Sequence, residues 1–346
     1  MYRLKEIDDI NIWNGFILNS EFEFYSFLAS YEWFELQKKS WKDVFRFWIY
    51  KNDEIIWVLP FIKNEAKRWT YLFSPHTPLI IKWEDFFVVL SWIIDEIKDF
   101  WKKHNASFIR FNSPVKNLKI NKKSFSELWF IDAPMHEHAE DTHLLDLTKT
   151  EDELFSAIKR KDRYLITRAI KEWVEVVKWN TQEQKEILIK MHIEHSKKVW
   201  YHPFKRNFIE KLYEVFWDNI TTISTRYNWI VESILMTIRF WETCVYYIAT
   251  SDIKNPKFSP NYLCQWEAIK QAKQYGCSIY NFWWVSPDNN PKHPIAWVTK
   301  FKRKFAWYDY SLLHAQDLVL SPKYYLNWWI ETFRRLKRWY YYKKPE

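Results

Sequence analysis

The chain contains two glycines and 24 tryptophans in 346 residues. Glycine usually makes up about 7% of a protein, so roughly 24 glycines would be expected at this length. Glycine supplies the left-handed backbone conformation that helix ends and tight hairpin turns require. A folded chain of this size with so few glycines must therefore place other residues at those turns.

Tryptophan occupies several positions where glycine is expected. Asn228-Trp229 lies between two strand-like runs, where a two-residue hairpin favours Asn-Gly. Trp241 lies in the next short turn between strand-like runs. Trp217 follows an amphipathic segment, as the genuine Gly276 does. Some bacterial lineages read the UGA codon as glycine, whereas a common alternative code reads it as tryptophan. We therefore hypothesise that many of these tryptophans are glycines in the living organism. The alternative is a genuinely Trp-rich binder of carbohydrate or of a membrane interface.

Bulk composition indicates an ordered cytoplasmic protein. The hydrophobic fraction is 48%, and 346 residues favour two domains. No apolar run approaches the roughly 20 residues of a membrane span, and the acidic N-terminus is unlike a signal peptide. The three cysteines have no paired spacing, which is typical of a reducing compartment. The net charge of +9 favours an anionic partner, such as nucleic acid, a phosphorylated small molecule or a membrane surface.

Helix and strand patterns alternate along the first third and restart after Thr142. Each half reads as mixed α/β with a largely antiparallel sheet, so the predicted fold class is α/β (α+β). We predict a first domain at 1–141 and a second at 142–320. The basic, aromatic C-terminal helix at 321–346 is expected to pack back on the first domain.

Several motifs in the second half occur in one order. They are Thr142 and Asp146-Leu147 on a strand; Lys161, Arg163, Ile166 and Ala169 on a helix before Trp173-Val174; Trp266 to Ile269; Tyr280-Asn281-Phe282-Trp283-Trp284; and Trp297, Phe301, Lys302 and Phe305 before Ala306-Trp307. Together they resemble the FemABX-type peptidyltransferases, which build the interpeptide branches of bacterial peptidoglycan. The resemblance covers nearly the whole chain and is densest in the second half.

The resemblance also bears on the tryptophans. The family has glycine at several of these Trp positions, including a Gly-Gly pair where this chain has Trp283-Trp284. Trp13, Trp33 and Trp266 instead match family tryptophans, so we expect those three to be genuine.

The resemblance implies two GNAT-like acyltransferase domains and a cofactor-independent enzyme of peptidoglycan biosynthesis, which contributes to cell wall and cell shape. Such an aminoacyltransferase moves an amino acid from aminoacyl-tRNA to the stem peptide of a UDP- or lipid-linked muramyl-peptide precursor. Both partners carry phosphates, which fits the excess of Lys and Arg, and DNA is not an expected partner. A lipid-linked precursor would add a peripheral membrane contact.

The reaction implied is aminolysis of an ester, in which a fixed cation stabilises the tetrahedral oxyanion. The resemblance assigns that role to Lys302, with Phe301 lining the ester channel. The alternative for Lys302 is a surface lysine of the basic run KFKRK. Tyr262 matches a substrate-facing tyrosine of the family, and its alternative is an ordinary core tyrosine.

Three further cations are candidates for precursor binding. Lys205 and Arg206 precede a helix and could contact phosphates, or they could form a solvated helix start. In the first half the family uses a lysine after its Trp-containing helix. Gln37 falls near that position here, so Lys38 is the candidate and the chain departs from the family pattern.

Two other functions would fit part of this sequence. An acyl-CoA-dependent GNAT N-acyltransferase would need a glycine-rich pyrophosphate loop, which is not found even when each Trp is read as Gly. A non-enzymatic basic, aromatic RNA or glycan binder would use real tryptophans for stacking. His136 and His138 form a His-x-His pair, but no cysteine or second cluster completes a ligand set. A solvated loop without metal is therefore expected there.

Overall fold

The computed structural model describes residues 2–18, 24–77, 79–80, 85–199, 203–257, 259–288, 290–305, 307–338 and 343–346. Two parts of the sequence predictions fall outside the described residues. They are Ala306 of the motif around Lys302 and 339–342 of the C-terminal helix predicted at 321–346.

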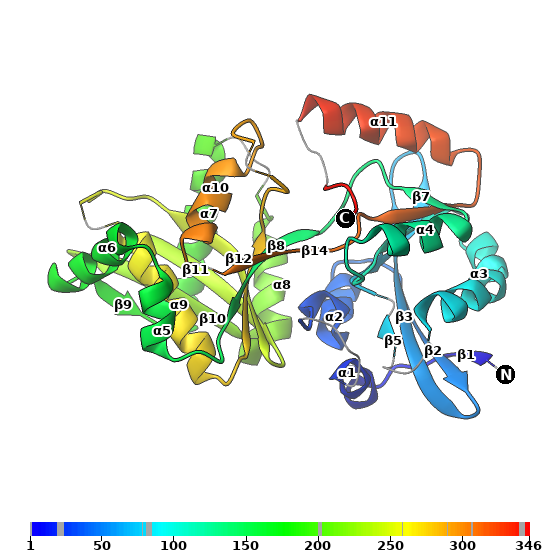
Figure 1. Cartoon of the computed structure of the whole chain (residues 1–346), viewed down its shortest axis with the longest axis horizontal. Helices are drawn as coiled ribbons and strands as arrows, with labels where there is room; N and C mark the ends of the chain where they lie inside the picture. Colours follow the sequence, from blue (N-terminus) through cyan, green and yellow to red (C-terminus); the bar gives the residue numbers. More distant parts are fainter. Residues whose placement is uncertain are drawn as a thin grey trace. The chain divides into compact units, whose positions relative to one another are not determined.

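The chain divides into two compact units, both drawn in Figure 1. Unit 1 comprises Met1–Asp141, Trp284–Trp297 and Tyr310–Glu346, and unit 2 comprises Thr142–Trp283 and Val298–Asp309. The predicted second domain, 142–320, therefore includes two segments that belong to unit 1.

Unit 1 combines a mixed sheet with helices. The strands follow the order β1-β2-β3-β4-β6-β15-β7, and β5 pairs with β3. β4 and β6 are parallel along their whole shared length, and the other pairs are antiparallel. The elements are β1 (Tyr2–Glu6), α1 (Ile10–Leu18), the 3₁₀ turn η1 (Phe27–Ala29), α2 (Tyr31–Lys39), β2 (Val44–Lys51), β3 (Glu54–Glu65), β4 (Thr70–Pro75), β5 (Leu79–Ile80), α3 (Phe86–Lys103), β6 (Ala106–Asn112), α4 (Lys119–Glu127), β7 (Phe130–Asp132), β15 (Gln316–Val319) and α11 (Tyr324–Lys337).

Unit 2 repeats this architecture around a second sheet, of order β14-β8-β13-β12-β11-β10-β9. β12 and β13 are parallel, whereas β9 to β12 are antiparallel neighbours. The elements are β8 (Asp141–Asp146), α5 (Glu151–Ala157), α6 (Arg160–Lys171), β9 (Glu175–Val177), α7 (Gln182–Val199), α8 (Arg206–Phe216), η2 (Trp217–Asn219), β10 (Ile220–Tyr227), β11 (Ile230–Phe240), β12 (Thr243–Ser251), α9 (Pro260–Gln274), β13 (Ile279–Trp284), α10 (Ala296–Lys302), η3 (Arg303–Phe305) and β14 (Tyr308–Ser311).

The core of unit 2 lies between its sheet and α5, α6 and α9. Ile166 of α6 and Leu263 and Ile269 of α9 are buried in one cluster with Leu235 of β11. Each fully buried aliphatic side chain contributes about 1.5–3 kcal/mol. Thr150 caps α5, and α5 and α6 are separate helices because the chain is extended and buried at Ile158.

Left-handed residues end several helices. Trp41, Trp129 and Trp173 follow α2, α4 and α6 with φ of 63°, 66° and 60°, and Gly276 follows α9 with φ of 78°. The backbone hydrogen bonds match as well. The residue after Trp173 and the residue after Gly276 each donate to a carbonyl five residues back. These tryptophans thus occupy the position that glycine usually takes at a helix C-terminus.

Turns between strands follow the same pattern. The β10–β11 hairpin turns at Asn228-Trp229 with φ of 48° and 68°, as a type I′ turn requires. Trp241 and Trp283 have φ of 52° and 62°. The expectation for Trp217 is wrong, because its φ of −44° continues α8 into η2 as right-handed backbone. Among the described residues, no helix has both the length and the apolarity needed to cross a membrane.

Candidate active site

The two parallel strands of unit 2 pair only at their beginnings. β12 and β13 are in register over Thr243–Val245 and Ile279–Asn281, and within the described residues no ladder joins them beyond that point. In unit 1, by contrast, the parallel ladder runs to the end of β4. β12 and β13 therefore separate at Tyr246 and Phe282, the residues that follow the last pair. The ring centroids of Tyr246 and Phe282 lie 6.3 Å apart.

Lys302 lies beside this opening. It is the last residue of α10, only 6% of its surface is exposed, and its Nζ lies 5.5 Å from the ring centroid of Tyr246. Burial lowers the pKa of the Lys302 amine to about 7, because the charged form loses its hydration. The lysine is therefore not a solvated member of the run KFKRK. Its amine can hold or release a proton near neutral pH.

Phe301 and Tyr262 form an aromatic wall next to Lys302. Their ring centroids lie 5.2 Å apart, and Phe305 contacts both rings. Burial raises the pKa of Tyr262, so its hydroxyl stays neutral at physiological pH. The structure thus brings three of the predicted site residues into one cluster.

The Tyr262 hydroxyl has polar partners that the sequence analysis did not identify. It accepts a hydrogen bond from Nζ of Lys304, and that amine lies 3.3 Å from a carboxylate oxygen of the buried Asp162. Lys304 belongs to the same basic run as Lys302, and Asp162 is the one acid in the stretch KRKDR of α6. Tyr262 is therefore both a core residue and a hydrogen-bonded one.

Asn281 carries a buried donor at the end of the β12–β13 ladder. Its side chain is fully buried, and its Oδ1 accepts a hydrogen bond from the backbone N–H of Trp283. Its Nδ2 has no acceptor among the described residues. A buried amide donor without an acceptor is uncommon and suits a site that a substrate carbonyl completes.

Lys205 and Arg206 lie at the start of α8. Lys205 is the exposed N-cap residue, and Arg206 forms ion pairs with Glu186 at 2.7 Å and Glu210 at 3.4 Å. Both acids compete with any phosphate for the guanidinium of Arg206.

Lys205 and Arg206 follow Phe204, whose ring stacks on Tyr247, whereas Lys302 lies over Tyr246. The contact of Lys205 and Arg206 with precursor phosphates stays a prediction.

Lys38 belongs to unit 1. It lies in α2, with its Nζ 3.4 Å from Asp8 and 3.3 Å from Glu35. Gln37, which precedes it, is buried. The role of Lys38 in precursor binding also stays a prediction.

The loop that carries His136 and His138 is not the solvated loop predicted from sequence. The ring of His138 packs 5.6 Å from Trp33 and 5.4 Å from Phe73, and only 11% of the His136 side chain is exposed. His136 instead contributes to a buried cluster with Glu140 and His314. The sequence analysis missed this set because His314 is far away in the chain.

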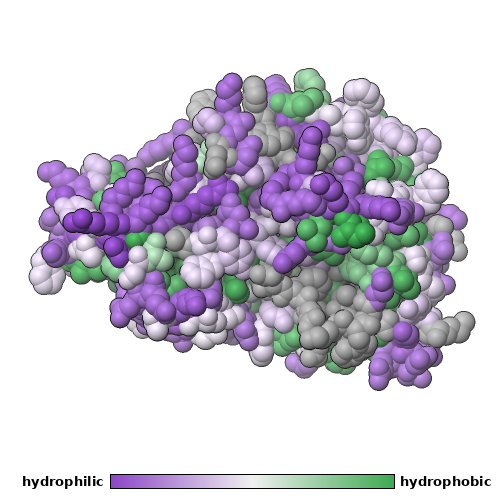
Figure 2. Space-filling model, in the orientation of Figure 1, coloured by the Kyte–Doolittle hydropathy of each residue, from purple (hydrophilic) through white to green (hydrophobic). Residues whose placement is uncertain are grey.

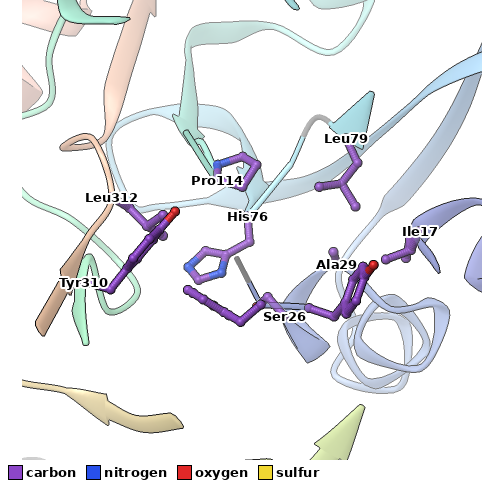
Figure 3. A pocket seen from close by; sticks show the side chains of 10 residues that line it. Ile17, Ser26, Ala29, His76, Leu79, Pro114, Tyr310 and Leu312 are labelled. Atoms are coloured by element: carbon purple, nitrogen blue, oxygen red, sulfur yellow. The ribbon is translucent and has the colours of Figure 1, made fainter. Parts of the chain in front are cut away.

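A small hollow in unit 1 surrounds His76, as Figure 3 shows with Tyr310 and Leu79 on either side of the imidazole. Its volume of about 20 Å³ is close to the minimum for one water molecule. Burial lowers the pKa of His76 to about 4, so the ring is neutral at pH 7. The hollow is too small for a nucleotide or peptide. It is lined by Ile17, Phe24, Tyr25, Ser26, Ala29, His76, Leu79, Pro114, Tyr310 and Leu312.

The fold has known counterparts among solved structures. A tandem GNAT protein from the clavulanic acid biosynthesis pathway superimposes with a TM-score of 0.57 at 8% identity, over 93% of this chain and 99% of that chain. L-PGS from Bacillus licheniformis gives 0.57 at 10% identity, over 94% and 96%. The chain therefore has a GNAT-like fold in two units.

The crystal structure of FemX is more similar in fold, with a TM-score of 0.77 at 14% identity over 94% of this chain and all of that chain. Residues 222–313, which include Tyr262, Phe301 and Lys302, match the FemAB family. This part of the chain therefore resembles the FemAB family, as its motifs predicted. No curated protein matches its sequence.

Proposed function

We propose that this protein transfers an aminoacyl group from aminoacyl-tRNA to the stem peptide of a peptidoglycan precursor. The observation that carries the proposal is Lys302, a buried amine at the point where β12 and β13 separate. The FemAB match includes this residue, and the FemX-like fold supports the same assignment. The excess of basic residues fits a polyanionic donor and a phosphate-bearing acceptor.

The chemistry follows from the site. The neutral amine of the stem peptide attacks the ester carbonyl of the donor, and the carbonyl oxygen becomes an oxyanion. When this intermediate collapses, the ester C–O bond breaks and the ribose hydroxyl of the tRNA leaves with the proton that the amine gives up. A protonated Lys302 in a poorly solvated site stabilises that oxygen strongly, because little water screens the interaction. Phe301 and Tyr262 provide an apolar wall for the ester.

The acyl-CoA alternative is less well supported by the loop between β12 and α9. The backbone N–H groups of Lys254 and Asn255 already donate to the carboxylate of Glu232, which is fully buried. Pro256 and Pro260 have no N–H to donate. A pyrophosphate needs several free N–H groups in such a loop, so these residues do not fit coenzyme A.

The direct test is a transfer assay. The protein is mixed with charged tRNA and a UDP-linked or lipid-linked precursor, and the precursor is followed by mass spectrometry. We expect a gain of one amino-acid residue that disappears after RNase treatment. A parallel reaction with acetyl-CoA in place of tRNA is the control. Acetyl transfer there, with none from tRNA to either acceptor, would favour the acyl-CoA function instead.

The helix α11 supports a peripheral membrane contact within this function. Leu326, Trp329, Phe333 and Leu336 recur at helical spacing and are each more than half exposed. On another side of the helix, the Tyr324 side chain is fully buried within unit 1. The space-filling view shows pale and green side chains mixed with purple ones around α11 (Figure 2).

Basic residues flank this apolar stripe of α11. Arg334, Lys337 and Arg338 line the same hollow as Trp329 and Phe333. An apolar stripe with flanking cations is the pattern of a helix that lies on an anionic lipid surface. Such a contact would place a lipid-linked acceptor near the enzyme.

Vesicle co-sedimentation tests the membrane contact. We expect binding to vesicles that contain phosphatidylglycerol, weaker binding at high salt, and at least a tenfold loss in Phe333→Glu. The matched control is Ile120→Glu, which changes an exposed apolar residue of α4 in the same unit. Equal binding to purely zwitterionic vesicles, or equal losses in both variants, would contradict the role of α11.

A further inference from the structure

Two histidines and a glutamate converge in unit 1, outside the residues used for transfer. Nδ1 of His314 lies 2.7 Å from Oε2 of Glu140, and Nδ1 of His136 lies 3.3 Å from the same oxygen. The three ligand atoms all lie within 4.8 Å of one another. Among the described residues, this is the one group of three or more such side chains with that geometry.

We propose that His136, Glu140 and His314 bind a divalent transition-metal ion, with zinc as the best fit. Two imidazoles and one carboxylate form a ligand set that zinc uses in proteins. Tetrahedral ligands about 2.0–2.2 Å from zinc are spaced roughly 3.3 Å apart. The observed separations from Oε2 of Glu140 require only small side-chain movements to meet that spacing.

Outer contacts already orient the ligands for a metal. Nε2 of His314 donates to the carbonyl oxygen of Ala133 at 2.8 Å, which leaves Nδ1 to face the cluster. Oε1 of Glu140 accepts the backbone N–H of Ala315 at 2.8 Å, which leaves Oε2 to face both imidazoles. Metal-binding histidines are commonly held by a second hydrogen bond of this kind.

Burial makes the cluster suited to a stably bound ion. Glu140 and His314 are almost fully buried, whereas the His136 side chain remains 11% exposed and gives the ion an entry side. The ring of Trp284 packs 5.0 Å from that of His136. A metal would hold the segment before Asp141 to the segment before β15, and it would stabilise unit 1 according to its affinity.

The competing explanation is a buried ion pair between Glu140 and a protonated His314. The same two atoms would then share a proton instead of a metal. The two explanations differ in whether the protein binds zinc through all three side chains.

The test uses the full chain after chelator treatment, with zinc chloride added in a calorimeter. We expect one equivalent to bind, a higher melting temperature with zinc, and at least a 100-fold loss of affinity in His136→Ala and in Glu140→Gln. The matched control, His76→Ala, removes another buried imidazole of unit 1 and should bind within threefold of the wild type. No binding by the wild type, or equal affinity in all variants, would overturn the proposal.

Cobalt provides a second readout that needs no variant. Glu140→Gln could fail to fold, because it weakens a buried charge pair. In that event the visible spectrum of Co²⁺ with wild-type protein decides. Intense bands of a four-coordinate site would support the proposal, and the weak spectrum of hydrated Co²⁺ would overturn it.

Discussion

Replacement of Lys302 by alanine is expected to lower aminoacyl transfer by about 10²–10³-fold, with a smaller effect on KM than on kcat. The reason is that the ammonium group interacts with charge that develops only in the transition state. Lys300→Ala is the matched control, since it removes an exposed lysine of the same helix. Full activity in Lys302→Ala, measured by the mass assay, would remove Lys302 from the mechanism.

The pH dependence separates two roles for this amine. Burial lowers the pKa of Lys302 to about 7, so the charged form is lost as pH rises through that value. A charged stabiliser therefore predicts that wild-type transfer falls above pH 7 relative to Lys302→Arg, which stays charged. A general base predicts the opposite trend. The comparison with Lys302→Arg matters because the attacking amine also titrates, and it does so in both proteins.

The same burial makes Lys302 costly for stability. Its pKa is lower in the folded chain than in the unfolded chain, so the unfolded state binds the extra proton between about pH 7 and pH 10. The contribution of Lys302 to the free energy of unfolding is therefore lowest below pH 7, and it rises as the pH increases from about 7 to 10. We expect Lys302→Met to be inactive but more stable by a few kcal/mol at pH 7, as measured by denaturant unfolding. The difference should shrink towards pH 10.

Part of the site was predictable because its residues are close together in the chain. Phe301 and Lys302 belong to one short motif, and Tyr262 to a second motif, so their identities carried the signal. The partners Lys304 and Asp162 were not predictable, because an ion pair between α6 and the end of α10 depends on how the helices pack.

Longer-range features needed the fold. His314 and Glu140 are separated by 174 positions, and no local pattern indicates that they meet. The ion pairs of Arg206 with Glu186 and Glu210 likewise depend on how α7 and α8 pack. Backbone conformation was more predictable. The pattern located the hairpin at Asn228-Trp229 and so predicted a left-handed residue at 229, whereas 173 was indicated only by the family resemblance.

Replacement of five tryptophans by glycine is expected to stabilise the chain. Trp41, Trp129, Trp173, Trp229 and Trp241 all have left-handed φ, and each is more than half exposed. A side chain in this conformation costs roughly 1–2 kcal/mol, and the greater freedom of unfolded glycine offsets part of that gain. We therefore expect about 0.5–1 kcal/mol for each position, or roughly 3–5 kcal/mol for all five, since distant sites add. Denaturant unfolding of the fivefold variant measures the sum.

The control is a tryptophan that the family resemblance marks as genuine. Trp13 is fully buried, and its Nε1 donates to the carbonyl oxygen of Ala29 at 2.9 Å. Trp13→Gly should therefore cost about 3–5 kcal/mol or more, because it leaves a large cavity and an unpaired carbonyl. If the fivefold glycine variant were less stable than the parent chain, the strain argument would fail.

Three other buried tryptophans differ from Trp13 in the hydrogen bonding of their indole N–H groups. Trp48, Trp57 and Trp101 fill the core of unit 1, yet their indole N–H groups have no acceptor among the described residues. A buried donor without a partner costs about 1–3 kcal/mol, whereas Trp13 has its partner. Peptide mass spectrometry of the native protein decides the identity of such residues directly. Tryptophan found at 229, 283 and 284 would contradict the glycine hypothesis. Glycine at these positions would explain the left-handed φ at 229 and 283.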